Sequence, residues 1–421
     1  MGAADTVMVS SVGEFAMSGV NIIDNINNFL VIAFIALSTG GAVVCSQYIG
    51  RQDHKSAALA SKQLVLIVFV ISLLITGIAL LFRGPIIRII YSSLEDDVMN
   101  AAMTYFLITA LSYPLLALYN ACAALYRSVG NTQVPMRIAV MVNVMNVGGN
   151  AYFIFGLHIG VAGVALSTLI TRAVAALILL VMLIRNQRIP VSLSGLFQVR
   201  LVPSMIKRIL NIGIPTGLEN SMFQFGRLLT QRIFPIFGTS IIAANAVTSV
   251  LNSFSFMPGN AYSIAILTIV GQCLGAGDIR AARYFTVKLM KITWITIFFL
   301  AGFILITRAQ LIGLFNLSSE ARDAAMLFLN IHCISMVVGW SFSFALPNAL
   351  RAAGDARFIM IVGTVSMWTV RVCAAYFFTF VLGIGPAGVW LAMGSDFLVR
   401  GTCFILRWRS GRWQNKKVID N

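Results

Sequence analysis

Long apolar stretches separated by short polar segments run along the whole chain. A stretch that crosses about 30 Å of hydrocarbon at 1.5 Å per residue needs roughly 20 residues. Each such stretch predicts a helix, because a backbone in lipid must satisfy its hydrogen bonds within its own segment. The alternation typical of a membrane barrel is missing. Eleven stretches are long enough, at 20–48, 61–82, 99–126, 134–156, 161–184, 205–236, 242–273, 284–306, 323–349, 358–382 and 387–407.

Three prolines lie inside these predicted helices. They are Pro114, Pro258 and Pro347. Proline removes one backbone hydrogen bond and clashes with the preceding turn of a helix. We therefore expect kinks at all three positions.

The pattern repeats at long range. A Gln-x-x-Gly-x-x-Asp motif occurs at 47–53 and again at 272–278, and a Gly-x-Ala-Gly-Val motif occurs at 160–164 and again at 385–389. Both pairs are 225 residues apart. Internal repeats of this kind are common in secondary transporters, where the substrate site lies at the interface of the repeats.

The repeat predicts an all-α integral membrane protein of two pseudo-symmetric six-helix bundles, with about twelve transmembrane helices. The expected parts are an N-terminal lobe at 1–185, a more polar cytoplasmic linker at 186–204, a C-terminal lobe at 205–409 and a cytoplasmic tail at 410–421.

The two copies begin differently. The second copy opens with a helix from about residue 205 to Gly238, and the same helix in the first copy would begin before Met1. Only about a dozen of its residues remain, which make about 18 Å of helix at 1.5 Å per residue. We therefore expect the first helix to be incomplete and Met1 to be an internal methionine of a longer parent.

Composition and charge agree with a membrane location. The chain is 59% hydrophobic and 10% charged, which excludes a soluble core with a wet surface. Its net charge of +16 comes from Lys and Arg residues that gather in alternate loops. By the positive-inside rule these loops are cytoplasmic. This predicts a multi-pass protein of the plasma (inner) membrane with a cytoplasmic C-terminus, and it removes the reason to expect nucleic-acid binding.

The stretch 134–156 carries a polar stripe. Asn143, Asn146 and Asn150 have the spacing of one helix face, and such a stripe must face protein or a water-filled cavity. Ordinary interhelical hydrogen bonding is one explanation. Asp5 suggests another, because a carboxylate in a membrane helix is a candidate functional group that could exchange a proton or hold sodium. An exposed Asp5 near the outer interface is the alternative.

Other charged residues in the spans allow two readings. Glu219, with Arg227 eight residues later on roughly the same face, is a candidate for the substrate cavity or for a structural ion pair. Asp396 and Arg400 have i, i+4 spacing and are expected to form a helix-stabilising pair. Asp24 is expected to be solvated near the outer end of its helix.

Aromatic and methionine side chains add candidates for a cavity that binds flat organic cations through stacking and cation–π contacts. Lipid-facing or core packing is the alternative for each of them. With Asn143 and Glu219, the cavity candidates are Phe223, Phe254, Met257 and Tyr262.

The repeated Gln-x-x-Gly-x-x-Asp turns have a structural explanation. Gly50 and Gly275 are expected to take the left-handed conformation that ends a helix, and Asp53 and Asp278 are expected to cap the next helix. Neither turn has the spacing of a phosphate-binding loop.

Catalytic and metal-binding patterns are missing from the sequence. The six cysteines are unpaired in spacing, and the three histidines lie in separate segments. We therefore predict a protein that is not an enzyme, has no cofactor and has no metal other than a possible sodium ion.

Several segments together resemble the multidrug and toxic compound extrusion (MATE) family of cation-coupled exporters. The resemblance covers nearly the whole chain and implies two lobes facing a cavity that opens alternately inward and outward, with organic cations exported against a proton or sodium gradient. The segments are DTVMVSSVG, YRSVGNTQVP, NVMNVGGNAYFIFG, IGIPTGLEN and GQCLGAGD.

The resemblance also implies a coupling site. In some members an Asp on the first helix joins an Asn and an Asp on the fifth and a Thr on the sixth, and the matching residues are Asp5, Asn146, Asn150 and Thr168. Asn150 departs from the pattern, since an acid is expected there. One carboxylate fewer weakens the case for sodium and leaves proton coupling through Asp5. Certain branches place a Glu where this chain has Phe223.

The sequence is thus interpreted as a monomeric antiporter whose partners are small organic cations and the lipid bilayer. Two alternatives remain: a lipid-linked precursor flippase of the same superfamily, and a non-transporting truncated fragment.

Overall fold

The computed structural model describes residues 1–421 except 1–7, 10, 91–94, 417 and 420–421. Its regular elements are helices throughout the described residues. The chain divides into two compact units. The first unit comprises residues 1–45 and 53–213, and the second comprises 46–52 and 214–421.

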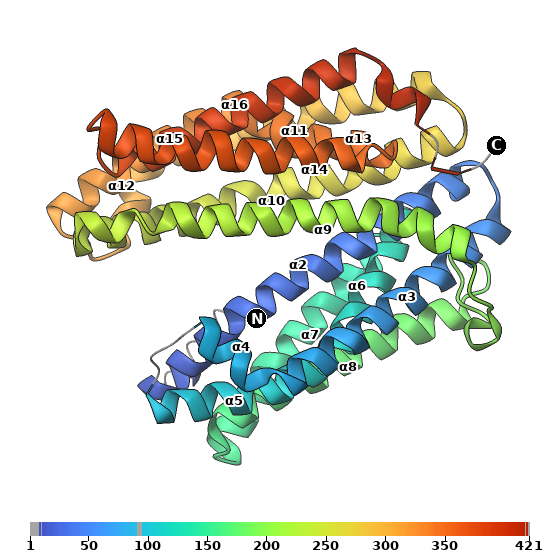
Figure 1. Ribbon diagram of the computed structural model, residues 1–421, viewed down its shortest axis with the longest axis horizontal. Coiled ribbons are helices and arrows are strands. Elements are labelled where there is room, and N and C mark those ends of the chain that lie inside the picture. Colours follow the sequence, from blue (N-terminus) through green and yellow to red (C-terminus); the bar gives the residue numbers. More distant parts are fainter. Residues whose placement is uncertain (1–7, 10, 91–94, 417, 420–421) are drawn as a thin grey trace. The chain divides into compact units, whose positions relative to one another are not determined.

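The first unit is a bundle in which α8 packs against α5, α6 and α7, while α3 packs against α6 (Figure 1). A short 3-10 turn, η2 (Leu196–Gln198), lies in the segment that leads to the next helix. The helices are α2 (Glu14–Gly50), α3 (His54–Leu81), α4 (Arg83–Ile90), α5 (Asp96–Leu111), α6 (Tyr113–Ser128), α7 (Gln133–Ala151), its π-helical extension η1 (Tyr152–Gly156), and α8 (Gly160–Arg185).

The second unit is built around two long helices, α10 and α11, with α12, α13 and α16 packed on them. Its elements are α9 (Pro203–Gln231, from Ile214 onward), η3 (Phe234–Phe237), α10 (Thr239–Gly275), α11 (Ile279–Gly313), α12 (Ser319–Ser335), η4 (Met336–Ala345), α13 (Leu346–Ala352), α14 (Ala356–Val365), η5 (Ser366–Val372), α15 (Cys373–Tyr376), η6 (Phe377–Val381), α16 (Ala387–Arg409) and η7 (Arg412–Asn415).

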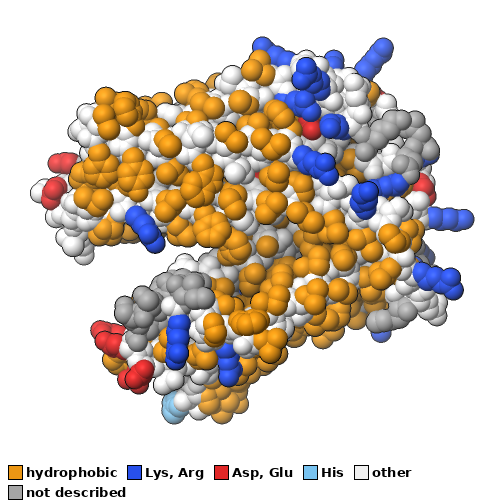
Figure 2. Space-filling view, in the orientation of Figure 1, with side chains coloured by type: hydrophobic (Ala, Val, Ile, Leu, Met, Phe, Trp, Pro, Cys, Tyr) orange, Lys and Arg blue, Asp and Glu red, His pale blue; other side chains and the backbone are white. Residues whose placement is uncertain are grey.

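The prediction of an all-α membrane protein is confirmed. Among the described residues, nine helical runs are long and apolar enough to span a membrane, or ten if the bent pair α5 and α6 forms one span. All eleven predicted stretches are helical. The stretch 205–236 forms α9, which is too polar to count as a span by composition. Hydrophobic side chains cover the visible helices of the second unit, and Lys and Arg side chains gather toward the end of α16 (Figure 2).

The prolines act differently at the three positions. The axes of α5 and α6 bend by 45° next to Pro114. Pro347 lies in the first turn of α13, directly after the π-helical run η4. Around Pro258, in contrast, α10 continues as one α-helix.

The glycines of the repeated motif do not have the predicted conformation. The positive φ angles in these turns belong to Gln52 (64°) and Gly277 (75°), and Gly50 and Gly275 are helical. The expected left-handed conformation at Gly50 and Gly275 is therefore wrong. The expected caps are confirmed, because Ser56 N–H donates to Asp53 at 3.0 Å and the equivalent bond is made at Asp278.

Close backbone packing explains the glycines instead. A Cβ added to Gly50 would lie 1.9 Å from the carbonyl oxygen of Gln272, and a Cβ on Gly275 would lie 1.9 Å from that of Gln47. Such distances are far below van der Waals contact. The ends of α2 and α10 therefore meet, within the second unit, through reciprocal glycines.

The segment 186–204 is held against the first unit. The Gln63 side chain donates to the Arg200 carbonyl at 2.7 Å and accepts from Val202 N–H at 3.2 Å. Val191 and Leu193 are fully buried. Its role as a cytoplasmic linker between two lobes, and the lobe boundaries themselves, stay predictions.

Candidate functional site

A cluster of neutral polar side chains lies between α7 and α8 in the first unit. We call Asn146, Asn150, Ser167 and Thr168 the amide cluster. Asn146 Nδ2 lies 3.4 Å from Ser167 Oγ and 3.5 Å from Thr168 Oγ1, and Ser167 Oγ donates to the Asn146 carbonyl at 3.0 Å. Both asparagines are fully buried. The structure thus brings Asn146 and Thr168 of the predicted coupling site into contact, and Asn150 lies buried one turn further along α7.

The local sequence explains how the helices approach. Gly149 lies between the two buried asparagines, and a Cβ there would lie 2.5 Å from Ser167 Oγ. A larger residue would hold α7 away from α8 and lengthen the Asn146 hydrogen bonds. Gly149 of NVGGNA therefore positions the cluster, whereas a Cβ on Gly148 would meet nothing within 4 Å.

The amide cluster offers oxygen atoms to a small cation. Asn146 Oδ1 is buried and has no hydrogen-bond partner among the described residues. Neutral oxygens of this kind coordinate sodium in transporters. The carboxylate that would complete the predicted site, Asp5, lies outside the described residues. Within them, no group of three or more His, Cys, Asp or Glu side chains could hold a metal ion.

The predicted asparagine stripe divides in the structure. Asn143 is exposed, whereas Asn146 and Asn150 are buried. Asn143 is therefore exposed on α7 and does not join the cluster.

Asp24 is not solvated as expected. Its Oδ1 accepts hydrogen bonds from the Tyr105 hydroxyl at 3.1 Å and from Asn27 at 3.4 Å. Asn27 in turn accepts from the Tyr113 hydroxyl at 2.8 Å. The expectation failed because these tyrosines come from α5 and α6, about 80 residues away in the sequence. Asp24 is thus a carboxylate of the first unit with defined hydrogen-bond partners.

The second unit holds a buried ionic network. We call Glu219, Arg351, Asp396 and Arg400 the arginine–carboxylate network. Glu219 lies 2.6 Å from an Arg351 Nη2 and 3.6 Å from Arg400 Nη2, and Asp396 lies 3.9 Å from Arg400 Nη1. Each of the four is at most 8% exposed. The Asp396–Arg400 pair exists as expected, but it is one edge of a larger network that joins α9, α13 and α16.

Aromatic rings cover the guanidinium groups of this unit. The Phe223 ring lies 5.3 Å from the Arg371 guanidinium carbon and 5.5 Å from that of Arg400, and the Phe344 ring lies 4.8 Å from Arg400. Cation–π contacts stabilise cations that have lost water. Phe223 therefore contacts protein cations, a use that competes with its predicted role in a substrate cavity. The positions of Arg351 and Arg371 around Glu219 do not follow from sequence spacing, because neither residue lies near Glu219 in the chain.

The other cavity candidates lie on α10. Phe254 and Met257, one turn apart, are 61% and 64% exposed. Tyr262 is half-buried and its hydroxyl lies 3.4 Å from Thr296 Oγ1 on α11. The three side chains do not form one cluster with the arginine–carboxylate network.

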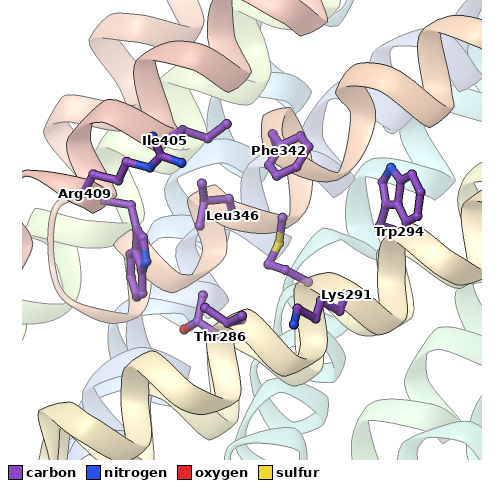
Figure 3. Close-up of a pocket in the computed structure, with 10 residues that line it drawn as sticks. Thr286, Lys291, Trp294, Phe342, Leu346, Ile405 and Arg409 are labelled. Carbon is purple, nitrogen blue, oxygen red and sulfur yellow. The ribbon is translucent and has the colours of Figure 1, made fainter.

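A pocket of the same unit is mainly apolar. It measures about 440 Å³ and lies between α11 and α16. Figure 3 shows Lys291 of α11 and Arg409 of α16 beside the apolar side chains of Phe342 and Leu346. Its two charged side chains are both cations, so it is unsuited to an organic cation.

The fold and its sites define a class of protein. The chain is a multi-pass, all-helical membrane protein of two helical units, each with a buried polar cluster in its interior. Buried ionisable and polar groups in membrane helices are typical of transport proteins.

Comparison with known proteins specifies the family. The MatE family matches residues 1–152 and 215–377. The chain therefore belongs to the MATE family of transporters, which is not a family of enzymes, and the predicted resemblance is confirmed.

Individual relatives agree with this assignment. The chain is 30% identical to the uncharacterized transporter YisQ of Bacillus subtilis, over 99% of this chain and 91% of that protein. It is 27% identical to the probable multidrug resistance protein NorM of Thermotoga maritima, over 99% and 90% of the two chains. The expected truncation of the first helix is not borne out by these alignments.

Solved structures share the fold. A MATE crystal structure in the bent conformation has a TM-score of 0.90 at 18% identity, covering 98% of this chain and 91% of that one. An outward-facing MATE transporter of the MOP superfamily also has a TM-score of 0.90, at 17% identity, with coverage of 98% and 92%.

Proposed function

We propose that this protein is a secondary active antiporter that exports organic cations in exchange for protons or sodium by alternating access. Family membership supports export, and relatives named as multidrug resistance proteins support drug-like substrates. The proposal includes a plasma-membrane location with the basic loops and the C-terminus in the cytoplasm, following the positive-inside rule.

The observation that carries the coupling site is the amide cluster. It is buried, neutral and has an unbonded acceptor at Asn146 Oδ1 among the described residues. In this proposal Asp5 supplies the single negative charge, and proton or cation binding there repacks its helix and lowers the affinity for substrate. One carboxylate with three neutral side chains favours a proton over sodium, because a monovalent cation loses one of the two charges that would hold it.

The arginine–carboxylate network is assigned a structural role in the same proposal. Its carboxylates are already paired with guanidinium groups at 2.6–3.9 Å. A carboxylate that is ion-paired in this way is a poor group for reversible protonation, because the neighbouring cation favours its charged form.

Dye efflux from proteoliposomes tests the proposal. The purified chain is reconstituted, loaded with rhodamine 6G, and driven by a proton gradient or by a sodium gradient. We expect proton-driven efflux that Asp5→Asn abolishes and Asn146→Ala reduces. Asp53→Asn is the matched control, because Asp53 is a helix cap outside the cluster. Efflux that ignores Asp5→Asn, or the absence of efflux under both gradients, would contradict the proposal.

A further inference from the structure

A small pocket in the second unit is lined by two arginines. Arg227 of α9 and Arg371 of η5 meet there with Gln231, Asn245 and Asn252. Among the described residues that line the pocket, none is acidic. Its polar lining is thus made of cations and neutral amides.

Arg371 is the unusual member of this pocket. Its side chain is buried, with 8% exposure, and its Nε has no hydrogen-bond partner in the part of the chain that the structure describes. No Asp or Glu oxygen of the described residues lies within 4.0 Å of its guanidinium. The contact with the Phe223 ring at 5.3 Å compensates only partly, because removing a guanidinium group from water costs more than one such contact returns. A buried charge without a partner is costly.

The acids nearby are already engaged. Glu219 holds Arg351 at 2.6 Å, and Asp396 accepts from Ser366 at 2.5 Å and lies 3.9 Å from Arg400. Asp396 also attracts Arg371, although at more than 4.0 Å, so two carboxylates serve three buried arginines, Arg351, Arg371 and Arg400. Arg371 is left as an excess positive charge in the interior of the unit.

The pocket adds a second cation and suitable dimensions. Arg227 is exposed and, like Arg400, repels Arg371. Two cations that repel each other are brought together at least cost when an anion lies between them. The pocket has a volume of about 40 Å³. At roughly 10–15 Å³ for each water-sized group, it has room for a group as small as a carboxylate.

We propose that the pocket of Arg227 and Arg371 binds a carboxylate or phosphate group of the exported compound, so that among organic cations the protein prefers zwitterions that also carry such an anion. Arginine suits this role because its planar donors match the two oxygens of such an anion. The substrate assignment rests on the proposed export function, but the binding of the anion does not.

A pair of matched dyes tests the proposal. Rhodamine 19 carries a free carboxylate, and rhodamine 6G is its ethyl ester with a similar cationic ring system. Binding of each dye to the purified chain in phosphatidylcholine nanodiscs is measured by fluorescence anisotropy, without any ion gradient. We expect at least tenfold tighter binding of the free acid. Equal affinities for acid and ester would overturn the proposal on the unaltered protein.

Substitutions show which side chains cause the preference for the free acid. Arg371→Gln and Arg227→Gln are expected to remove the preference for the acid, and Arg371→Lys to restore part of it. Arg232→Gln is the matched control, since Arg232 is exposed and lies outside the pocket lining. An equal loss in Arg232→Gln would overturn the proposal, and so would retention of the preference in Arg227→Gln.

Lipid is a competing source of the same chemistry. The acid preference is measured again in nanodiscs that contain phosphatidylglycerol. A preference that survives supports the substrate assignment, and one that disappears assigns the pocket to a lipid headgroup and overturns it. Failed efflux in proteoliposomes with intact acid preference would count against export alone, so the two proposals fail separately.

Discussion

The two units solve the problem of polar groups in a membrane in opposite ways. The amide cluster of the first unit is neutral and keeps an unbonded oxygen at Asn146. The arginine–carboxylate network of the second unit is highly charged and internally paired. A neutral cluster can accept or release a small cation at modest cost, whereas a paired network cannot lose a member without exposing a buried charge. An approximate sequence repeat has thus produced one adaptable site and one rigid site.

The largest expected effect comes from breaking the rigid site. Glu219→Gln leaves Arg351 buried without its 2.6 Å partner. We expect a loss of about 3–5 kcal/mol in the free energy of unfolding, measured by denaturant titration in mixed micelles. The double variant Glu219→Gln, Arg351→Gln should recover most of that loss. Asn146→Ala should cost far less. If it costs as much as Glu219→Gln, the two clusters do not differ as argued.

A smaller loss is expected from the reciprocal glycines. Gly275→Ala places a methyl group 1.9 Å from a backbone carbonyl oxygen, so α2 and α10 must separate. Overpacking of this kind costs about 1–3 kcal/mol, seen as a lower melting temperature. Gly302→Ala in α11 is the matched control, because a Cβ there meets nothing within 4 Å. Similar melting temperatures for the two variants would contradict the packing argument.

Adding a negative charge to the amide cluster, the adaptable site, should change the ion that drives transport. Asn150→Asp restores the acid that the family pattern predicts, and a second carboxylate strengthens the attraction for sodium. We expect dye efflux to need a sodium concentration about ten times lower than in the unaltered protein. This corresponds to about 1.4 kcal/mol in the free energy of sodium binding. Asn143→Asp is the control, since Asn143 is exposed on the same helix. An equal gain in that variant would show that the position in the cluster is unimportant.

The smallest effect is expected at Asp24. An asparagine there can still accept the Tyr105 hydroxyl bond, so Asp24→Asn should cost about 0.5–1.5 kcal/mol of stability at most and leave proton-driven efflux intact. Tyr105→Phe serves as the companion variant, because it removes the donor of that 3.1 Å bond. Loss of efflux in Asp24→Asn with normal stability would transfer the coupling role from Asp5 to Asp24.

Much of the fold could be read from hydropathy. Every predicted stretch became helical, and Asp53 and Asp278 cap helices as the motif indicated. The first-unit site was partly predictable too, since Asn146 and Asn150 share a helix face and Thr168 follows from the family pattern. The role of the glycines in the motif was predicted wrongly. A local turn preference carries no information about packing against a backbone segment about 225 residues away in the sequence.

The arginine–carboxylate network could not be predicted from the sequence for a related reason. Glu219 and Arg351 are 132 residues apart, and many other pairings of the chain's charges fit the same sequence. Asp24 was misread as solvated because its Tyr105 partner is 81 residues away.

The sequence by itself determined the helices, because lipid forces each apolar segment to satisfy its hydrogen bonds internally. It also determined the repeat and the family. Only the tertiary structure decided which polar faces meet. That choice depends on how closely helix backbones approach, through residues such as Gly149 and Gly50, and electrostatic pairing falls off within a few ångströms. The structure thereby separated a neutral cluster from a charged one and left Arg371 without a carboxylate within 4.0 Å among the residues it describes.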